Sequence, residues 1–304
     1  MKTNDTNKIV DISFLKEKKK VVYKSHPITL SQNQYNFIYN LLPKVKRTRP
    51  IIHCRKLIIE ALFYVLKTGC QWRLLPNNFP PFRIVHRFFR KLCVLGTWDK
   101  ITKVLCFGDL FYKQNSLSFP DALIIIDSKS IRTSCYYNGS NRGYDGHKKI
   151  DGIKLCPVID KAARLWSIQM FSANTNECKA FQVGLERAIV PKLTPTPIVG
   201  IGDRFFDSQP FKDHCLSVLN LYFVTLAKGK SCKGETQEEA DAKKFEQKKI
   251  SDMISPIRYI IEQTFAHLEQ SRRLVMVYER KSSSYLGMVN LRFIQMWLNR
   301  LMPH

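Results

Sequence analysis

The sequence predicts a mixed α/β domain preceded by a smaller, basic α-helical domain. Three observations support this fold class. Apolar residues between positions 30 and 105 recur at helical spacing, short aliphatic runs alternate with helical segments after position 122, and a polar stretch separates the two regions. The chain has 304 residues, 44% of them hydrophobic and 24% charged, which suits two unequal domains and excludes a disordered or fibrous protein.

The composition along the chain predicts four segments. We expect a flexible basic arm at 1–28, a helical domain at 29–112, a linker at 113–121 and the α/β domain at 122–304. The arm is rich in lysine and has few residues that could pack, so a solvated leader is the alternative interpretation.

Cap residues mark the first two helices of the N-terminal region. Ser31 and Gln34 form a capping-box pattern, and the apolar stripe that follows ends at Pro43. A second apolar stripe runs from position 57 to 66, and Gly69 stands where glycine commonly ends a helix. Each helix has one apolar face, so we expect them to pack together.

The third helix, expected over residues 82–95, has an apolar face and a strongly basic one. Its cations recur at spacings of three and four: Arg83, Arg87, Arg90 and Lys91. Because such a face suits a phosphate-lined groove, we interpret it as the recognition helix of a helix-turn-helix-like DNA-binding domain. A merely solvated basic face is the alternative.

The region after position 122 alternates strands with helices. The expected strands are 122–126, 154–159, 165–171, 197–202 and 221–226, and the expected helices include 177–190, 257–274 and 286–301. Residues 228–249 are rich in Lys, Glu and Gln, and we expect an exposed loop with at most a frayed helix there. This order predicts a mixed sheet flanked by helices.

The net charge of +24 identifies nucleic acid as the expected partner, because self-repulsion of that size is costly without a polyanion. The nine cysteines form no CxxC pair, which argues against a disulfide framework or a zinc ribbon. No apolar run is long enough to span a bilayer, and no secretory signal is apparent. We therefore expect a cytoplasmic, nucleoid-associated protein with no membrane partner.

Three acidic residues stand out in this basic chain. Asp127 and Asp203 each follow an expected strand, and Glu262 lies in an expected helix, four residues after Arg258. Carboxylates at the ends of neighbouring strands could share hard cations, so an Asp, Asp, Glu set predicts a site for two Mg²⁺ or Mn²⁺ ions acting on a phosphodiester. A strand-terminal Asp is also a common turn former or helix cap, which is the alternative.

Further basic residues are expected to contact a DNA backbone. Residues 143–149 form a glycine-flanked hairpin pattern that carries Lys148 and Lys149, and Lys154 follows. Arg258 could orient a carboxylate or hold a phosphate. A solvated turn or a surface ion pair is the alternative for each of them.

Several segments together resemble a known family. They are 125–130, 146–154, 172–174 with Glu177, 202–208 and 258–265, preceded by 68–76 and 96–98. In this order they resemble the transposases of the fifth family of bacterial insertion sequences, within the DDE class. The resemblance covers nearly the whole chain, from about residue 30 to about residue 301.

The resemblance implies an RNase-H-like catalytic domain in which Asp127, Asp203 and Glu262 are the catalytic, metal-binding triad. In such enzymes water attacks the phosphodiester at the element's end, and the freed 3′-hydroxyl attacks target DNA. The implied partner is double-stranded DNA, namely the terminal inverted repeats and the target. Since two DNA ends must be paired, we expect a homodimer in the synaptic complex.

Three positions depart from the family pattern. Phe205 stands where the family usually has glycine, Glu269 stands where related enzymes often place a base, and His267 occupies a position that is commonly aromatic and apolar in the family. None of these changes removes a carboxylate. They leave open an alternative function, that of a catalytically inactive copy that still binds inverted repeats and acts as a repressor.

Overall fold

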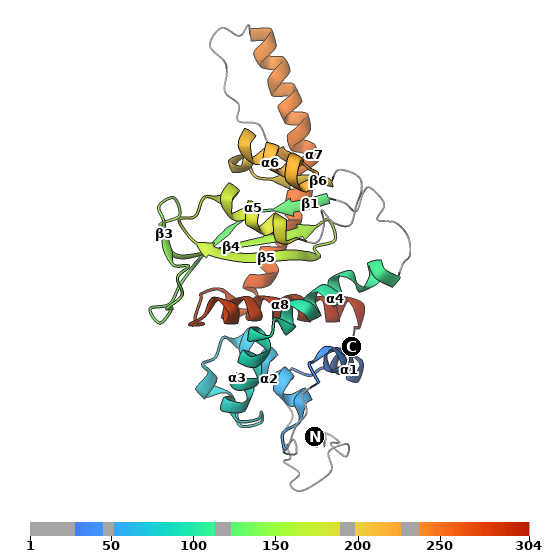
Figure 1. Cartoon of the computed structure of the whole chain (residues 1–304), viewed down its shortest axis with the longest axis vertical. Helices are drawn as coiled ribbons and strands as arrows, with labels where there is room; N and C mark the ends of the chain where they lie inside the picture. Colours follow the sequence, from blue (N-terminus) through green and yellow to red (C-terminus); the bar gives the residue numbers. More distant parts are fainter. Residues whose placement is uncertain (1–27, 45–51, 113–122, 189–197, 226–236, 304) are drawn as a thin grey trace, which may run out of the picture. The chain divides into compact units, whose positions relative to one another are not determined.

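The computed structural model describes residues 28–44, 52–112, 123–188, 198–225 and 237–303 (Figure 1). The predicted arm, except residue 28, and the predicted linker at 113–121 lie outside the described residues. Two compact units form. The first comprises the described parts of Met1–Leu105, Gln270–Leu274 and Ser283–His304, and the second comprises those of Cys106–Glu269 and Val275–Ser282.

The first unit is helical, as the periodicity predicted. Its elements are α1 (Gln32–Leu41), α2 (Arg55–Thr68), η1 (Trp72–Leu74), α3 (Phe82–Val94), the start of α4 (Thr97–Tyr112), η5 (Arg272–Leu274) and nearly all of α8 (Ser282–Leu301). The capping box of Ser31 and Gln34 is present, and Gly69 ends α2 with a φ of 70°. The predicted starts of α1 and α3 and the predicted end of α2 are therefore confirmed.

The C-terminal helix α8 belongs to this helical unit and not to the α/β unit, so the structure differs from the predicted domain at 122–304. A Cβ placed on Gly287 would meet Cys93 Sγ at 2.5 Å, which shows how closely α8 approaches α3. Ser284 Oγ accepts a hydrogen bond of 3.2 Å from Arg90, and the Met302 carbonyl accepts one of 2.8 Å from Gln34. The apolar stripe of α8 needs a partner surface, and the N-terminal helices provide it.

The second unit is built on a seven-stranded mixed sheet. The strands are β1 (Leu123–Ile126), β2 (Lys129–Arg132), β3 (Gly143–Asp145), β4 (Ile150–Asp160), β5 (Leu165–Ser172), β6 (Ile198–Gly202) and β7 (Leu221–Thr225). Strand β4 pairs antiparallel with β1, β2, β3 and β5. Strands β1, β6 and β7 are parallel neighbours in that order. The near-continuous apolar runs of β1 and β6 fit these central positions.

Helices cover both faces of this sheet: α5 (Glu177–Arg187) lies on one face and α7 (Gln237–Glu269) on the other (Figure 1). Helix α6 (Gln209–Leu219) packs against β7. The expected loop at 228–249 is wrong from residue 237 onward, because α7 begins there; residues 226–236 lie outside the described residues. This part of α7 lacks an apolar stripe, which is why periodicity did not reveal it.

Candidate active site

The parallel pairing of β1 with β6 brings Asp127 and Asp203 to the same edge of the sheet. Ile124 pairs with Gly200 and Ile125 with Ile201. Continued by two residues, this register sets Asp127 opposite Asp203. Neighbouring strands lie about 4.8 Å apart, so two carboxylates that leave adjacent parallel strands at matching positions are close neighbours. Two of the three predicted carboxylates therefore come together.

The surroundings of Asp127 disfavour the ionised form of its carboxyl group. Burial is the largest cause that raises the pKa of its carboxyl, and together with the nearby charges of Glu177 and Asp203 it brings this pKa to about 6. The Ser128 amide, which donates a hydrogen bond of 2.8 Å to Asp127 Oδ1, and the Arg258 guanidinium act in the opposite direction. Carboxylate oxygens are ligands of hard divalent cations, so a cation bound at this edge of the sheet would offset the negative charge near Asp127.

Helix α7 supplies the remaining predicted residues of the site. It packs against β1 and β6, and Arg258 Nη1 lies 3.8 Å from Asp203 Oδ1. Glu262 follows one turn later on α7, with an exposed side chain. Within the described ranges, no three His, Cys, Asp or Glu side chains lie close enough together to hold a metal ion. The structure thus joins Asp127, Asp203 and Arg258, and leaves Glu262 on the same helix as Arg258 without a direct contact to the two aspartates.

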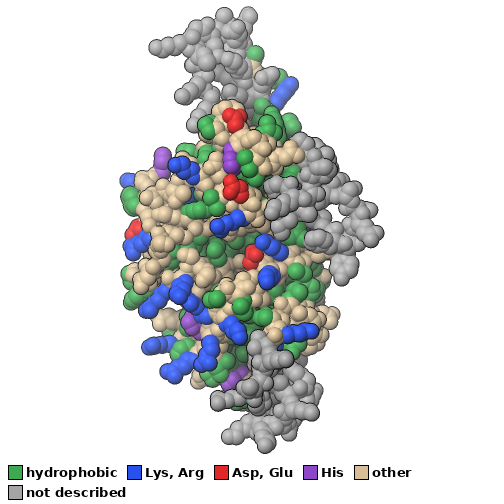
Figure 2. Space-filling model, viewed as in Figure 1, with side chains coloured by type: hydrophobic (Ala, Val, Ile, Leu, Met, Phe, Trp, Pro, Cys, Tyr) green, Lys and Arg blue, Asp and Glu red, His purple; other side chains and the backbone are tan. Residues whose placement is uncertain are grey.

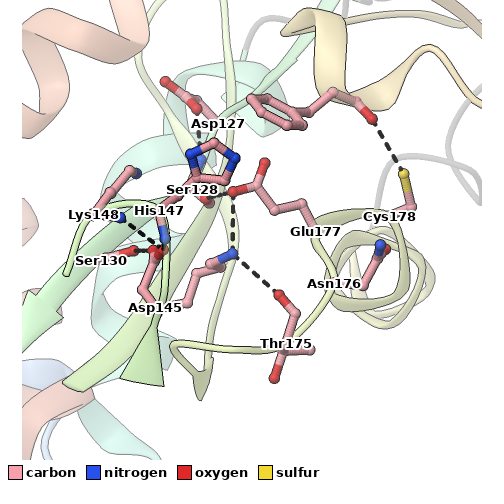
Figure 3. A network of polar contacts seen from close by, with 12 residues as sticks. Asp127, Ser128, Ser130, Asp145, His147, Lys148, Thr175, Asn176, Glu177 and Cys178 are labelled. Atoms are coloured by element: carbon pink, nitrogen blue, oxygen red, sulfur yellow. Dashed lines mark hydrogen bonds and ion pairs between the residues drawn. The ribbon is translucent and has the colours of Figure 1, made fainter. Parts of the chain in front are cut away.

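A buried polar network continues from Asp127 (Figure 3). Ser128 Oγ donates a 2.6 Å hydrogen bond to Glu177 Oε1, and Lys154 Nζ lies 3.2 Å from the same oxygen. Lys154 also donates to the Thr175 carbonyl at 3.1 Å, and only 7% of this residue is exposed. The predicted DNA contact by Lys154 is therefore wrong in this structure, because its ammonium is directed into the protein and paired there.

The predicted basic hairpin exists, as strands β3 and β4 with a tight turn. The buried Asp145 carboxylate accepts hydrogen bonds of 3.1 Å from the backbone amides of His147 and Lys148, and one of 2.6 Å from Ser130 Oγ. Lys149 closes the turn in the left-handed region, with a φ of 52°. Lys148 and Lys149 both have exposed side chains, so they are available to a phosphate backbone.

In the helical unit, α3 carries the basic face that the sequence predicted. Arg83, Arg87 and Lys91 are exposed, whereas Arg90 is half-buried and bonded to Ser284. Lys and Arg side chains gather on the surface over α3 (Figure 2). Three of the four predicted cations are thus free to meet an anionic partner, and the fourth also holds the unit together.

Glu269, one of the three departures from the family pattern, is paired. Its carboxylate lies 2.5 Å from Lys129 Nζ on β2, and Lys129 also lies over the Phe265 ring, 5.5 Å from the ring centroid. The negative charge of Glu269 is therefore compensated by its ion pair with Lys129 of β2.

Comparison with known families decides the relationship. Residues 30–102 match the family model described as "Putative transposase of IS4/5 family", and residues 118–294 match the model described as "Transposase DDE domain". The second match covers more than half of the chain. The chain belongs to the DDE transposase family. The mixed sheet flanked by helices in this transposase is the RNase-H-like fold that the resemblance implied.

Solved structures with some similarity to the transposase include two kinds of transposase complex. A cryo-EM structure of the piggyBac synaptic complex with hairpin DNA is 16% identical, with 69% of this chain and 44% of that chain covered and a TM-score of 0.29. The Mos1 paired-end complex with the left transposon end is 12% identical, with 84% and 80% covered and a TM-score of 0.24. The transposase thus spans less than half the length of the piggyBac chain. None of the curated proteins matches it significantly.

The site contains two residues to which sequence reasoning gave no role. Glu177 appeared only as part of a family-like segment, and Ser128 was not singled out, although both lie next to Asp127 in the structure. Sequence spacing could not reveal them, because their contact joins residues 49 positions apart.

Along the described part of the transposase, no helix has the length and apolar character needed to cross a membrane.

Proposed function

We propose that this transposase binds the terminal inverted repeats of an insertion sequence, cuts the phosphodiester at the element's end, and joins the freed 3′ end to target DNA. One observation carries the proposal: the register of β1 with β6 places Asp127 beside Asp203, and Arg258 faces Asp203. With Glu262, one helical turn after Arg258, these carboxylates form the proposed catalytic and metal-binding set.

Each residue of the set has a role that follows from its place. Asp127 and Asp203 would provide oxygen ligands at the sheet edge, and Glu262 would complete the set from α7. Two Mg²⁺ or Mn²⁺ ions bound there would activate the attacking water or 3′-hydroxyl and stabilise the leaving oxygen. Arg258 would position Asp203 and, once a substrate is bound, neutralise charge on a nearby phosphate. In the first step a bond from the water oxygen to phosphorus would form as the bond from phosphorus to the 3′ oxygen breaks, which leaves a free 3′-hydroxyl. In the second step the oxygen of this hydroxyl would form a bond to a phosphorus of the target as a phosphodiester bond of the target breaks.

DNA binding is assigned to exposed cations on both units. The helical unit would hold the inverted repeat through Arg83, Arg87 and Lys91 on α3, and the catalytic unit would contact the backbone through Lys148 and Lys149. Since two ends must be joined, the working form would be a homodimer on two ends, in the nucleoid of a bacterial cytoplasm.

The test is cleavage of a labelled duplex that carries the element's end, in the presence of Mg²⁺ or Mn²⁺. We expect metal-dependent nicking by the native protein and none by D127N, with end binding retained by both. The matched control is D213N, which makes the same change at an exposed residue of α6 and should leave nicking unchanged. End binding without metal-dependent nicking by the native protein would refute the enzymatic function and favour the inactive, repeat-binding alternative.

A further inference from the structure

The carboxylate of Glu177 joins three separate segments of the catalytic unit. It stands in the first turn of α5, where Asn176 caps the helix by accepting a hydrogen bond from the Lys179 amide. Its Oε1 atom accepts from Ser128, which stands two residues after the end of β1, and from Lys154 in the middle of β4. One oxygen atom thus connects the N-terminus of α5, strand β4 and the residue next to Asp127.

The ion pair between Glu177 and Lys154 is expected to add little to the stability of the fold, because both charges must lose hydration to form it. The side chains are 21% and 9% exposed, so both charges have lost much of their hydration. Apolar residues of similar size often stabilise a protein as well as a buried ion pair does, or better. Such a pair is therefore better explained by what it positions than by the stability it adds.

The position that this pair fixes is that of Ser128. The Ser128 hydroxyl is held by Glu177 at 2.6 Å, while the amide of the same residue donates to Asp127 Oδ1 at 2.8 Å. A shift of the Ser128 backbone would move this amide away from the Asp127 carboxylate, and the bond from the Ser128 hydroxyl to Glu177 opposes such a shift. Figure 3 shows Ser128 between the side chains of Asp127 and Glu177. Hydrogen bonds from an outer shell commonly orient the ligands of a metal ion in this way.

We propose that Glu177, held by Lys154, is a positioning residue that orients Asp127 for a divalent cation through Ser128. This inference rests on the proposed function, since it assumes that Asp127 binds the ion. Glu177 itself need not touch the metal or the DNA. Its contribution is to fix the orientation of Asp127, the residue that follows β1.

The test is titration of the full-length protein with Mn²⁺, with free Mn²⁺ followed by electron paramagnetic resonance, so that no turnover is needed. E177A and E177Q both remove the charge of Glu177, but only the amide of E177Q keeps an oxygen that can accept from Ser128. The difference between them therefore measures orientation separately from electrostatic attraction. We expect E177A to bind Mn²⁺ roughly tenfold more weakly than E177Q, as is common for outer-shell residues.

A second variant and a matched control complete the test. S128A removes the hydroxyl but keeps the backbone amide. We expect the single variant to weaken Mn²⁺ binding, and the double variant with E177A to bind no more weakly than E177A itself. S128A also tests the proposal if E177A does not fold. E186A removes another carboxylate of α5, one that pairs with His214, and should bind Mn²⁺ as the native protein does. Equal binding by E177A and E177Q, or native binding by S128A, would overturn the positioning role.

D127N separates this inference from the proposed function. Loss of Mn²⁺ binding in D127N, with E177A and E177Q unaffected, would remove only the role of Glu177. Native binding by D127N, or no binding by the native protein, would instead refute the metal site on which both proposals rest.

Discussion

Replacement of Asp127 by Asn should make the metal-free protein more stable at neutral pH. Burial raises the pKa of the Asp127 carboxyl to about 6 in the folded protein, whereas the unfolded chain has a value of about 3.9. Because the folded pKa is the higher one, this group favours folding below pH 3.9, and that contribution is lost as the pH rises through 6. A shift of about 2 units corresponds to roughly 3 kcal/mol at pH 7, each unit being worth about 1.36 kcal/mol. The neutral amide of D127N avoids this cost and can still accept from the Ser128 amide.

The assay is urea denaturation of the native protein and D127N without divalent metal, at several pH values between 4 and 8. We expect D127N to gain about 2–3 kcal/mol in the free energy of unfolding at pH 7, and the gain to vanish near pH 4. D213N, changed at an exposed site, should show no such dependence. A gain that does not depend on pH, or a loss of stability at pH 7, would show that ionised Asp127 is not costly and would refute the reasoning.

Three further predictions concern the site and its surroundings. The Cβ of G202A would meet Phe206 and Phe223 at 2.8 Å, just before Asp203. We therefore expect this variant to lose about 1–3 kcal/mol in the free energy of unfolding and to lose more nicking than end binding. Unchanged nicking would show that the end of this strand tolerates displacement. R87A should weaken end binding and lower its salt slope by about one unit; an unchanged slope in a salt titration would make Arg87 a solvated residue. E269Q should change the free energy of unfolding by less than about 1 kcal/mol, because the pair with Lys129 is partly exposed to solvent. It should also steepen the salt dependence of DNA binding, because it frees the Lys129 cation; an equal slope would show that Lys129 does not reach DNA.

The sequence predicted elements whose signals are local. Ser31 and Gly69 identified helix ends because capping and a left-handed backbone depend on residues a few positions away. Asp127 and Asp203 could be predicted as neighbours because the carboxyl ends of parallel strands meet at one edge. These predictions needed the order of strands but not their detailed register.

Other features depend on tertiary contacts that spacing does not encode. Lys154 pairs with Glu177 only when β4, β1 and α5 have assembled. In the sequence alone, a lysine of a basic protein without a visible acidic partner predicts a DNA contact. The placement of α8 with the N-terminal helices requires knowledge of which apolar faces fit together, as at Gly287 against Phe89. Both the error at Lys154 and the different domain boundary have this cause.

The joining of the last helix to the first ones has a consequence for synthesis of the protein. During translation, α1 to α3 leave the ribosome long before Ser284 and Gly287 exist, so the part of their surface that α8 covers stays exposed until the chain is nearly finished. A prematurely terminated product would therefore carry the basic helix in an incompletely packed bundle. Such fragments should therefore bind DNA less well than the full-length protein, in which α8 completes the helical unit.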